Sequence, residues 1–200
     1  MLDDPSVGEE VRQASNTLLR EGAQKLEAKL LFLRHAFGSA GMSDSVADIH
    51  EAKRVIEKYA AHYKPELSWD IQTAHFTNFH VRMLMQLVLL AIDSLPRGGT
   101  IAIRITDHES KPAIALHCIA KNDRPGIEPT ITLKPEIMAV VEQKVDEHAW
   151  EARSIHANFA SHVATQLSTR ITATQLNPRE VIFAANGLAP VADINREGLS

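Results

Sequence analysis

The feature that most constrains the fold is a long helical segment near the N-terminal end of the 200-residue chain. Residues 6–37 contain no proline, and Gly22 is the only glycine near the middle of this segment. Its apolar residues recur at steps of four and three and form a heptad pattern: Leu19, Ala23, Leu26, Leu30, Leu33 and Phe37. A single helix cannot cover such a stripe, so residues 1–41 are predicted to supply one helix of a dimeric helical bundle.

The character of the sequence changes at residues 38–41, where Gly-Ser-Ala-Gly interrupts the helical pattern. Residues 42–185 are predicted to form a second unit, and residues 186–200 a tail. The periodicity and the turn residues of this unit predict strands at 46–49, 67–72, 100–106, 113–120, 169–176 and 181–185, and helices at 50–63, 78–95, 135–145 and 150–168.

The mixture of helices and hairpins predicts an α+β sandwich with a sheet on one side and helices on the other. Alternation in the third predicted strand places Ile101, Ile103 and Ile105 on the covered face of that sheet. We expect Thr77 or Asn78 to cap the long apolar helix.

Composition excludes several classes of protein. The formal net charge is −4 and no long run of like charges occurs, which argues against nucleic-acid binding. Cys118 is the only cysteine, so neither an intramolecular disulfide nor a Cys-based zinc site can form. The longest apolar stretch, residues 83–92, is shorter than the roughly 18 residues of a membrane span. The acidic N-terminus differs from a signal peptide, so we expect a cytoplasmic protein.

Residues 86–99 resemble a segment of bacterial histidine kinases, the N box NLxxNA followed by a PxGG turn. Gln86 and Leu90 stand where that motif has its two asparagines, and Leu90 has no oxygen with which to hold Mg²⁺. Asp123 and Gly126 faintly resemble the first glycine-rich box. The glycines that a phosphate cradle requires are otherwise missing. These positions therefore predict a degenerate nucleotide site without ATP, magnesium or another cofactor.

Three further segments are similar to the ChpT-type histidine phosphotransferase family. They are residues 2–6 (LDDPS), 25–38 (KL through FLRHAFG) and 63–70 (YKPELSWD). The resemblance implies a dimeric four-helix bundle joined to a degenerate histidine-kinase ATPase-like (Bergerat-like) sandwich. It also implies a phosphorelay function, with response-regulator receiver domains and the receiver of a hybrid kinase as partners.

In that family the phosphoacceptor is a histidine, followed by an acidic residue, on the first bundle helix. The sequence printed here aligns from the turn after that helix, so no catalytic residue is assigned, and we expect this chain to be inactive in the transfer on its own and not to be an ATP-dependent kinase. We expect a start at an internal methionine, and the alternative is a true loss of the acceptor. The other histidines lack the spacing of helical zinc ligands, as His156 and His162 illustrate, so no metal site is predicted.

Phe32 lies off the heptad stripe, with Lys25 and Lys29 on the same flank of the helix. It either packs on a second bundle interface or, with the two lysines, docks the acidic pocket of a receiver. Two other functions remain open. The chain could be a divergent ATP-binding domain of a histidine kinase, or an adaptor that docks response regulators without catalysis.

Overall fold

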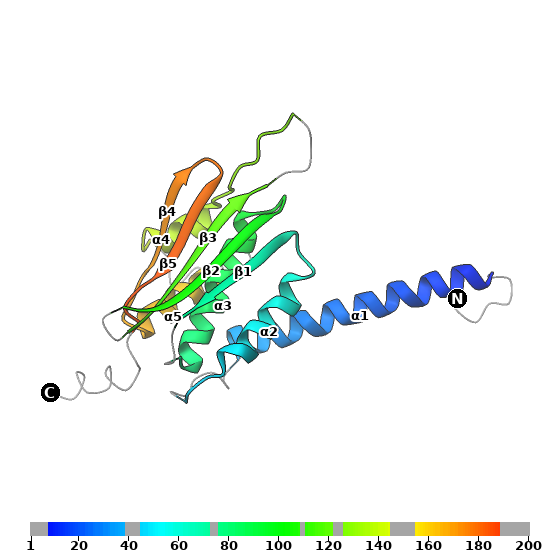
Figure 1. Ribbon diagram of the computed structural model, residues 1–200, viewed down its shortest axis with the longest axis horizontal. Helices are drawn as coiled ribbons and strands as arrows, with labels where there is room; N and C mark the ends of the chain where they lie inside the picture. Colours follow the sequence, from blue (N-terminus) through cyan, green and yellow to red (C-terminus); the bar gives the residue numbers. More distant parts are fainter. Residues whose placement is uncertain are drawn as a thin grey trace.

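The computed structural model describes residues 8–38, 45–72, 76–108, 111–121, 126–144 and 155–188. These residues form helices and strands that are interspersed along the chain (Figure 1). The elements are α1 (Glu9–Phe37), α2 (Ile49–Ala60), β1 (Pro65–Ile71), α3 (Asn78–Ser94), β2 (Gly99–His108), β3 (Lys111–Ala120), α4 (Pro135–Val141), α5 (Ile155–Gln166), β4 (Ile171–Asn177) and β5 (Glu180–Ala185).

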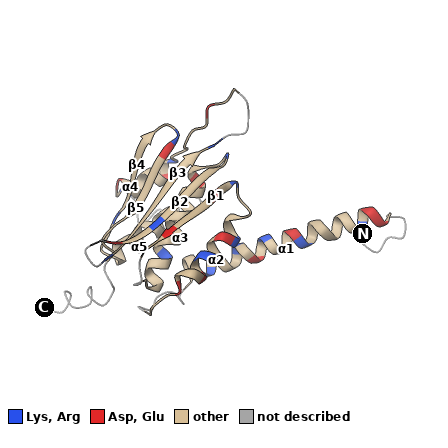
Figure 2. Cartoon of the chain, in the orientation of Figure 1, with Lys and Arg blue, Asp and Glu red and all other residues tan. Residues whose placement is uncertain are grey.

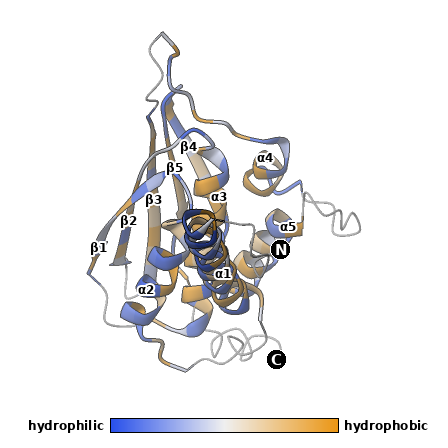
Figure 3. Cartoon of the chain, turned by 90° about the vertical axis from the view of Figure 1, so that its right-hand side faces the viewer, coloured by the Kyte–Doolittle hydropathy of each residue, from blue (hydrophilic) through white to orange (hydrophobic). Residues whose placement is uncertain are grey.

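The strands form one mixed sheet in the order β1-β2-β3-β5-β4. β1 runs parallel to β2, and the remaining neighbours are antiparallel. The sheet forms one layer and the helices pack on one of its faces (Figure 3). Ile101, Ile103 and Ile105 are buried beneath the helices, as predicted. The α+β prediction, with an N-terminal helix preceding the sandwich, is confirmed.

α3 occupies the centre of the helical layer, and most of its residues are buried. It begins after Thr77, whose backbone N–H donates to Nδ1 of His80 at 3.1 Å. This confirms Thr77 as the cap of the helix. α3 packs against α1, α5 and the sheet, so it contacts every layer of the molecule.

The strand predicted at residues 46–49 is wrong. Val46 forms only an isolated bridge with Thr77, and Ile49 already belongs to α2. The reason is Asp48, whose carboxylate accepts a hydrogen bond from the His50 amide at 2.8 Å and caps the helix. α5 begins at Ile155 in the described chain, and the first residues of the predicted helix, 150–154, lie outside the described residues.

None of the helices that the structure describes is long and apolar enough to cross a membrane. α1 extends well beyond the sandwich, and only its C-terminal part lies against α2 and α3 (Figure 1).

The turn between α3 and β2 depends on two glycines. Gly98 has φ +104° and Gly99 has φ +151°, both in the region that L-residues rarely adopt. A Cβ atom on Gly99 would overlap the carbonyl oxygen of Ile119 on β3. The PxGG turn is therefore required by the pairing of β2 with β3, independently of any nucleotide.

We expect Gly99→Ala to lower the free energy of unfolding by about 1–3 kcal/mol, because the new methyl group is strained and collides with β3. Urea denaturation measures this loss. Thr100→Ala, at the next residue, is the control and should cost less than about 1 kcal/mol. Equal losses in the two variants would contradict the steric explanation.

Candidate functional site

The predicted heptad stripe of α1 is largely uncovered. Leu19, Leu26 and Leu30 are 59%, 57% and 59% exposed, and Ala23 is exposed as well. The last two stripe positions, Leu33 and Phe37, instead pack partly against the core of the sandwich. Aligned leucines on one helix make a contiguous apolar surface of the kind that soluble monomers rarely leave open.

Phe32 does not belong to an accessible surface. Its side chain is fully buried and stacks on Tyr59 of α2, with ring centroids 4.0 Å apart. The face of α1 opposite the stripe packs on the sandwich through Ala28, Phe32 and Ala36. The docking hypothesis for Phe32 is therefore corrected, because Phe32 has no exposed atoms to offer to a receiver.

Lys25 and Lys29, the other two residues of that hypothesis, are exposed on α1. Lys25 lines a groove of about 370 Å³ between α1 and the end of α2, together with Leu18, Gly22 and His62. Charged residues of both signs are spread along α1 (Figure 2). A partner that enters this groove would meet an ammonium group beside an apolar side chain.

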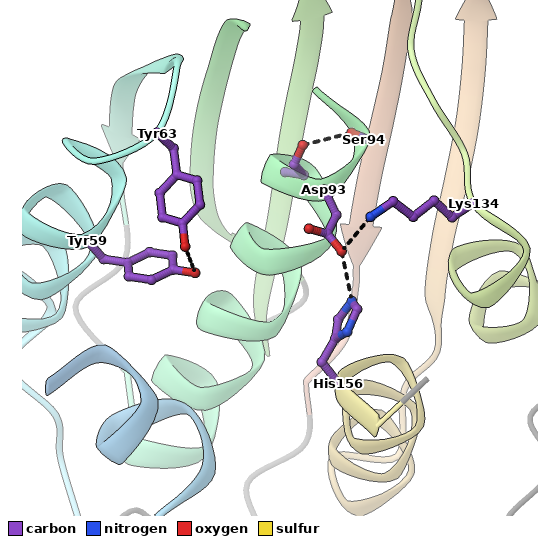
Figure 4. Close-up of polar contacts among 7 residues, drawn as sticks. Tyr59, Tyr63, Asp93, Ser94, Lys134 and His156 are labelled. Carbon is purple, nitrogen blue, oxygen red and sulfur yellow. Dashed lines mark hydrogen bonds and ion pairs between the residues drawn. The ribbon is translucent and has the colours of Figure 1, made fainter. Parts of the chain in front are cut away.

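Polar and aromatic contacts hold α1 against α2. The Tyr63 hydroxyl donates to the Tyr59 hydroxyl at 2.9 Å (Figure 4). Burial, together with this hydrogen bond, raises the pKa of Tyr59 far above its ordinary value, so Tyr59 stays neutral. An ion pair of 3.3 Å between Lys58 and Glu27 adds a contact at the surface.

The two residues at the N-box positions, Gln86 and Leu90, face the interior. Gln86 is fully buried, and its Nε2 donates to the carbonyl oxygen of Ala36 at the end of α1 at 3.0 Å. Leu90 is fully buried in the core. Gly126 has φ +79° and open space around it, whereas Asp123 lies outside the described residues. In the structure, the two N-box positions thus contribute to packing.

A charged cluster lies at the C-terminal end of α3 (Figure 4). Oδ2 of Asp93 is 3.4 Å from Nζ of Lys134 and 3.4 Å from Nε2 of His156. These side chains come from α3, from the residue before α4 and from α5. A carboxylate at a helix C-terminus is disfavoured by the helix dipole, and the ammonium group of Lys134 offsets that cost.

Sequence reasoning missed this cluster because its members are far apart along the chain. In the sequence, the spacing of His156 bears only on metal binding, and Asp93 and Lys134 belong to no recognisable sequence motif. In the part of the chain that the structure describes, no three His, Cys, Asp or Glu side chains gather as a metal site requires.

Comparison with known families identifies the chain. The family profile described as the histidine phosphotransferase C-terminal domain matches residues 49–179. The chain belongs to this histidine phosphotransferase family. The match covers the sandwich from α2 to the turn before β5.

Relatives of the family extend the likeness to α1. Protein phosphotransferase ChpT of Brucella abortus (strain 2308) is 22% identical over 168 residues, which are 84% of this chain and 76% of that protein. The solved structure of a bacterial phosphotransferase matches with a TM-score of 0.74 and 22% identity, covering 90% of this chain and 81% of the other. The ChpT-type resemblance is thereby confirmed.

The sandwich also shares its fold with histidine kinases. The catalytic domain of the histidine kinase ThkA matches with a TM-score of 0.51 and 11% identity, over 73% of this chain and 97% of that domain. The predicted kinase-like architecture is therefore present in this histidine phosphotransferase.

We expect Asp93→Asn to lower the free energy of unfolding by about 1 kcal/mol, because the ion pair with Lys134 and the contact with His156 are weakened and both are partly exposed. Urea denaturation at low salt and at 1 M NaCl (about a 3 Å screening length) measures the effect, which should shrink at high salt. Glu128→Gln, on the exposed segment before α4, is the control and should change stability by less than about 0.5 kcal/mol. A loss in Asp93→Asn that does not respond to salt would contradict an ionic origin.

Proposed function

We propose that this protein relays phosphoryl groups between receiver domains in the cytoplasm, without binding ATP. Its partners are the receivers of response regulators and of a hybrid kinase. The observation that carries the proposal is the environment of α3 in a member of the histidine phosphotransferase family. The helix buries Leu90 at the position where a nucleotide site needs an oxygen ligand. At the C-terminal end of the helix, the carboxylate of Asp93 contacts Lys134 and His156.

The chemistry of such a relay needs one nucleophilic imidazole. Its nitrogen attacks the phosphorus of an aspartyl phosphate, the P–O bond to the aspartate breaks, and the carboxylate leaves. The aspartate of a second receiver then attacks the phosphohistidine and frees the imidazole. The transfer consumes no nucleotide, so the sandwich can dispense with ATP.

The acceptor belongs on a helix that packs against the exposed stripe of α1. Several described histidines have structural partners: His80 accepts the Thr77 amide, His117 lies 3.3 Å from Glu180, and His156 pairs with Asp93. A helix over Leu26 and Leu30 would instead present its own imidazole beside the groove that Lys25 lines. Residues 1–41 would then act as the bundle and residues 42–185 as its supporting sandwich, followed by a tail.

Two other functions compete with the relay. A divergent kinase domain would bind Mg-ATP, which the burial of Leu90 opposes. An adaptor would bind receivers but exchange no phosphoryl group.

A thermal-shift titration separates these functions. A ligand at a hundred times its dissociation constant stabilises the native state by about 2.7 kcal/mol. For a protein of this size that raises Tm by roughly 5–10 °C. We expect such a rise with a cognate receiver domain, found by testing the receivers of the same organism, and no rise with millimolar Mg-ATP. A rise with Mg-ATP would establish the kinase alternative.

Exchange of label with a radioactively phosphorylated receiver then distinguishes the relay from the adaptor. The full product of the gene is used. The relay predicts an acid-labile, base-stable phosphoryl group on the protein, whereas an adaptor binds the receiver and acquires no label.

We also propose that α1 mediates homodimerisation through Leu19, Ala23, Leu26 and Leu30. The double variant Leu26→Asp and Leu30→Asp should dissociate the dimer, because each carboxylate would be buried without a partner. Analytical ultracentrifugation measures the mass, and circular dichroism shows whether the helix persists. The matched control is Thr17→Asp with Gln24→Asp, which adds the same charge at exposed polar positions of α1. An unchanged mass for a helical Leu26/Leu30 variant would show that the stripe is not the interface.

A further inference from the structure

Two long polar side chains lie deep inside the molecule on the central helix α3. Arg82 is 3% exposed and Gln86 is 0% exposed. They are four residues apart, so they lie on one face of the helix, one turn from each other. Burying an arginine and an amide is costly unless both find hydrogen-bond partners, so the identity of those partners is informative.

Both side chains donate to backbone carbonyls at the end of α1. A guanidinium nitrogen of Arg82 donates to the carbonyl oxygen of Gly38, and Nε2 of Gln86 donates to that of Ala36. The last carbonyls of a helix have no partner within the helix and carry partial negative charge. Arg82 and Gln86 therefore cap α1 from a helix more than forty residues away in the sequence.

The guanidinium of Arg82 is held by the end of α1 and by an aromatic ring. Its Cζ lies 5.9 Å from the centroid of the Phe159 ring on α5, and Phe159 in turn lies 4.9 Å from Phe37 of α1. Within the described residues Arg82 forms no ion pair with a carboxylate, and burial lowers its pKa from the ordinary arginine value. In the described part of the chain, the favourable electrostatic contacts of this charge are with the carbonyl of Gly38, at the C-cap of α1, and with the ring of Phe159.

The contact lies at the C-terminal end of α1, so a small change of angle there is amplified along the helix. From Ala36 to Leu19 is 17 residues, or about 26 Å of α-helix. A tilt of about 10° at the anchored end would displace the exposed stripe by roughly 4–5 Å over that length. Displacements of even about 1 Å can slow a reaction between aligned groups a hundredfold.

We propose that Arg82 and Gln86 are positioning residues, which fix the angle between α1 and the sandwich and so hold the receiver-docking surface in one geometry. The inference rests on the proposed relay function. It gives Gln86 a different use from the N-box residue that its position resembles: its amide holds the backbone of the bundle helix. The sandwich would thus hold α1 at a fixed angle.

Distances between two spin labels test the geometry directly. One label is placed on α1 at Gln24→Cys and the other on β1 at Ser68→Cys, both at exposed positions. The native Cys118 is fully buried, and burial raises its pKa to about 12, so it does not compete for the label. Labelled protein is diluted into excess unlabelled protein so that only distances within one chain are measured.

The hydrogen bonds from Arg82 and Gln86 to the end of α1 are here called the clamp. The clamp is removed by Arg82→Met with Gln86→Leu, which approximately keeps side-chain volume and removes the donors. We expect the distance distribution to become at least twice as wide as in the labelled protein that keeps Arg82 and Gln86. The matched control, Arg179→Met with Gln175→Leu, makes the same chemical changes at exposed positions of β4 and of the β4–β5 turn and should leave the width unchanged. Gln86→Leu alone serves if the double variant does not fold, and should broaden the distribution to a smaller extent.

Phosphoryl exchange with the cognate receiver is measured on the same variants. We expect at least a tenfold slower exchange in the clamp variant, partial recovery in Arg82→Lys, and no change in the control. Unchanged distance widths in the clamp variants would overturn the inference, and so would broadened widths with an unchanged exchange rate. If the wild-type protein exchanges no phosphoryl group, the relay function fails, and the distances still decide whether the clamp exists.

Discussion

The burial of α3 is the constraint on which the other parts of the structure depend. One face of this helix covers the sheet, whose isoleucines on β2 require an apolar lid. Its remaining faces contact α1 and α5, so α3 has almost no surface left for solvent. A helix surrounded in this way buries polar side chains at a cost, which a hydrogen-bond partner lowers. Every polar group on α3 is therefore informative about what the helix holds in place.

α1 satisfies two requirements with opposite faces. One face carries Ala28, Phe32 and Ala36 into the sandwich, where small residues allow the helices to approach closely. The other carries the exposed leucines of the heptad stripe. The two faces overlap near the C-terminal end, where Leu33 and Phe37 contact the sandwich. The same helix is thus part of the domain at one end and an extended arm at the other.

Local patterns in the sequence were sufficient for most of the fold. The alternation of Ile101, Ile103 and Ile105, the cap at Thr77 and the heptad stripe each follow from the spacing of neighbouring residues, and the structure contains the strand, the cap and the helix. Val46 was misassigned because its β propensity is local, whereas the cap at Asp48 determines the chain there.

The site was less accessible to sequence reasoning because its contacts are distant in the chain. The stripe of α1 marked one face correctly, but only the structure shows that Phe32 stacks on Tyr59. The pairing of Asp93 with Lys134 and His156 depends on tertiary packing and has no local signature. A signal for these contacts was present, since Arg82 and Gln86 are four residues apart in a stretch of α3, residues 81–92, that is otherwise apolar.

The parallel pairing of β1 with β2 has a consequence for how the chain folds. Parallel neighbours need a crossover, and here the crossover is α3 itself, whereas β2 and β3 form a local hairpin. Local hairpins close faster than pairings that wait for a long connection. A nascent chain therefore leaves the ribosome with α1 and β1 synthesised before the elements that hold them. Until α3 follows, α1 is unanchored, and the face that carries Ala28, Phe32 and Ala36 is exposed together with the leucines. Apolar surface that is exposed during folding in this way favours aggregation or capture by a chaperone.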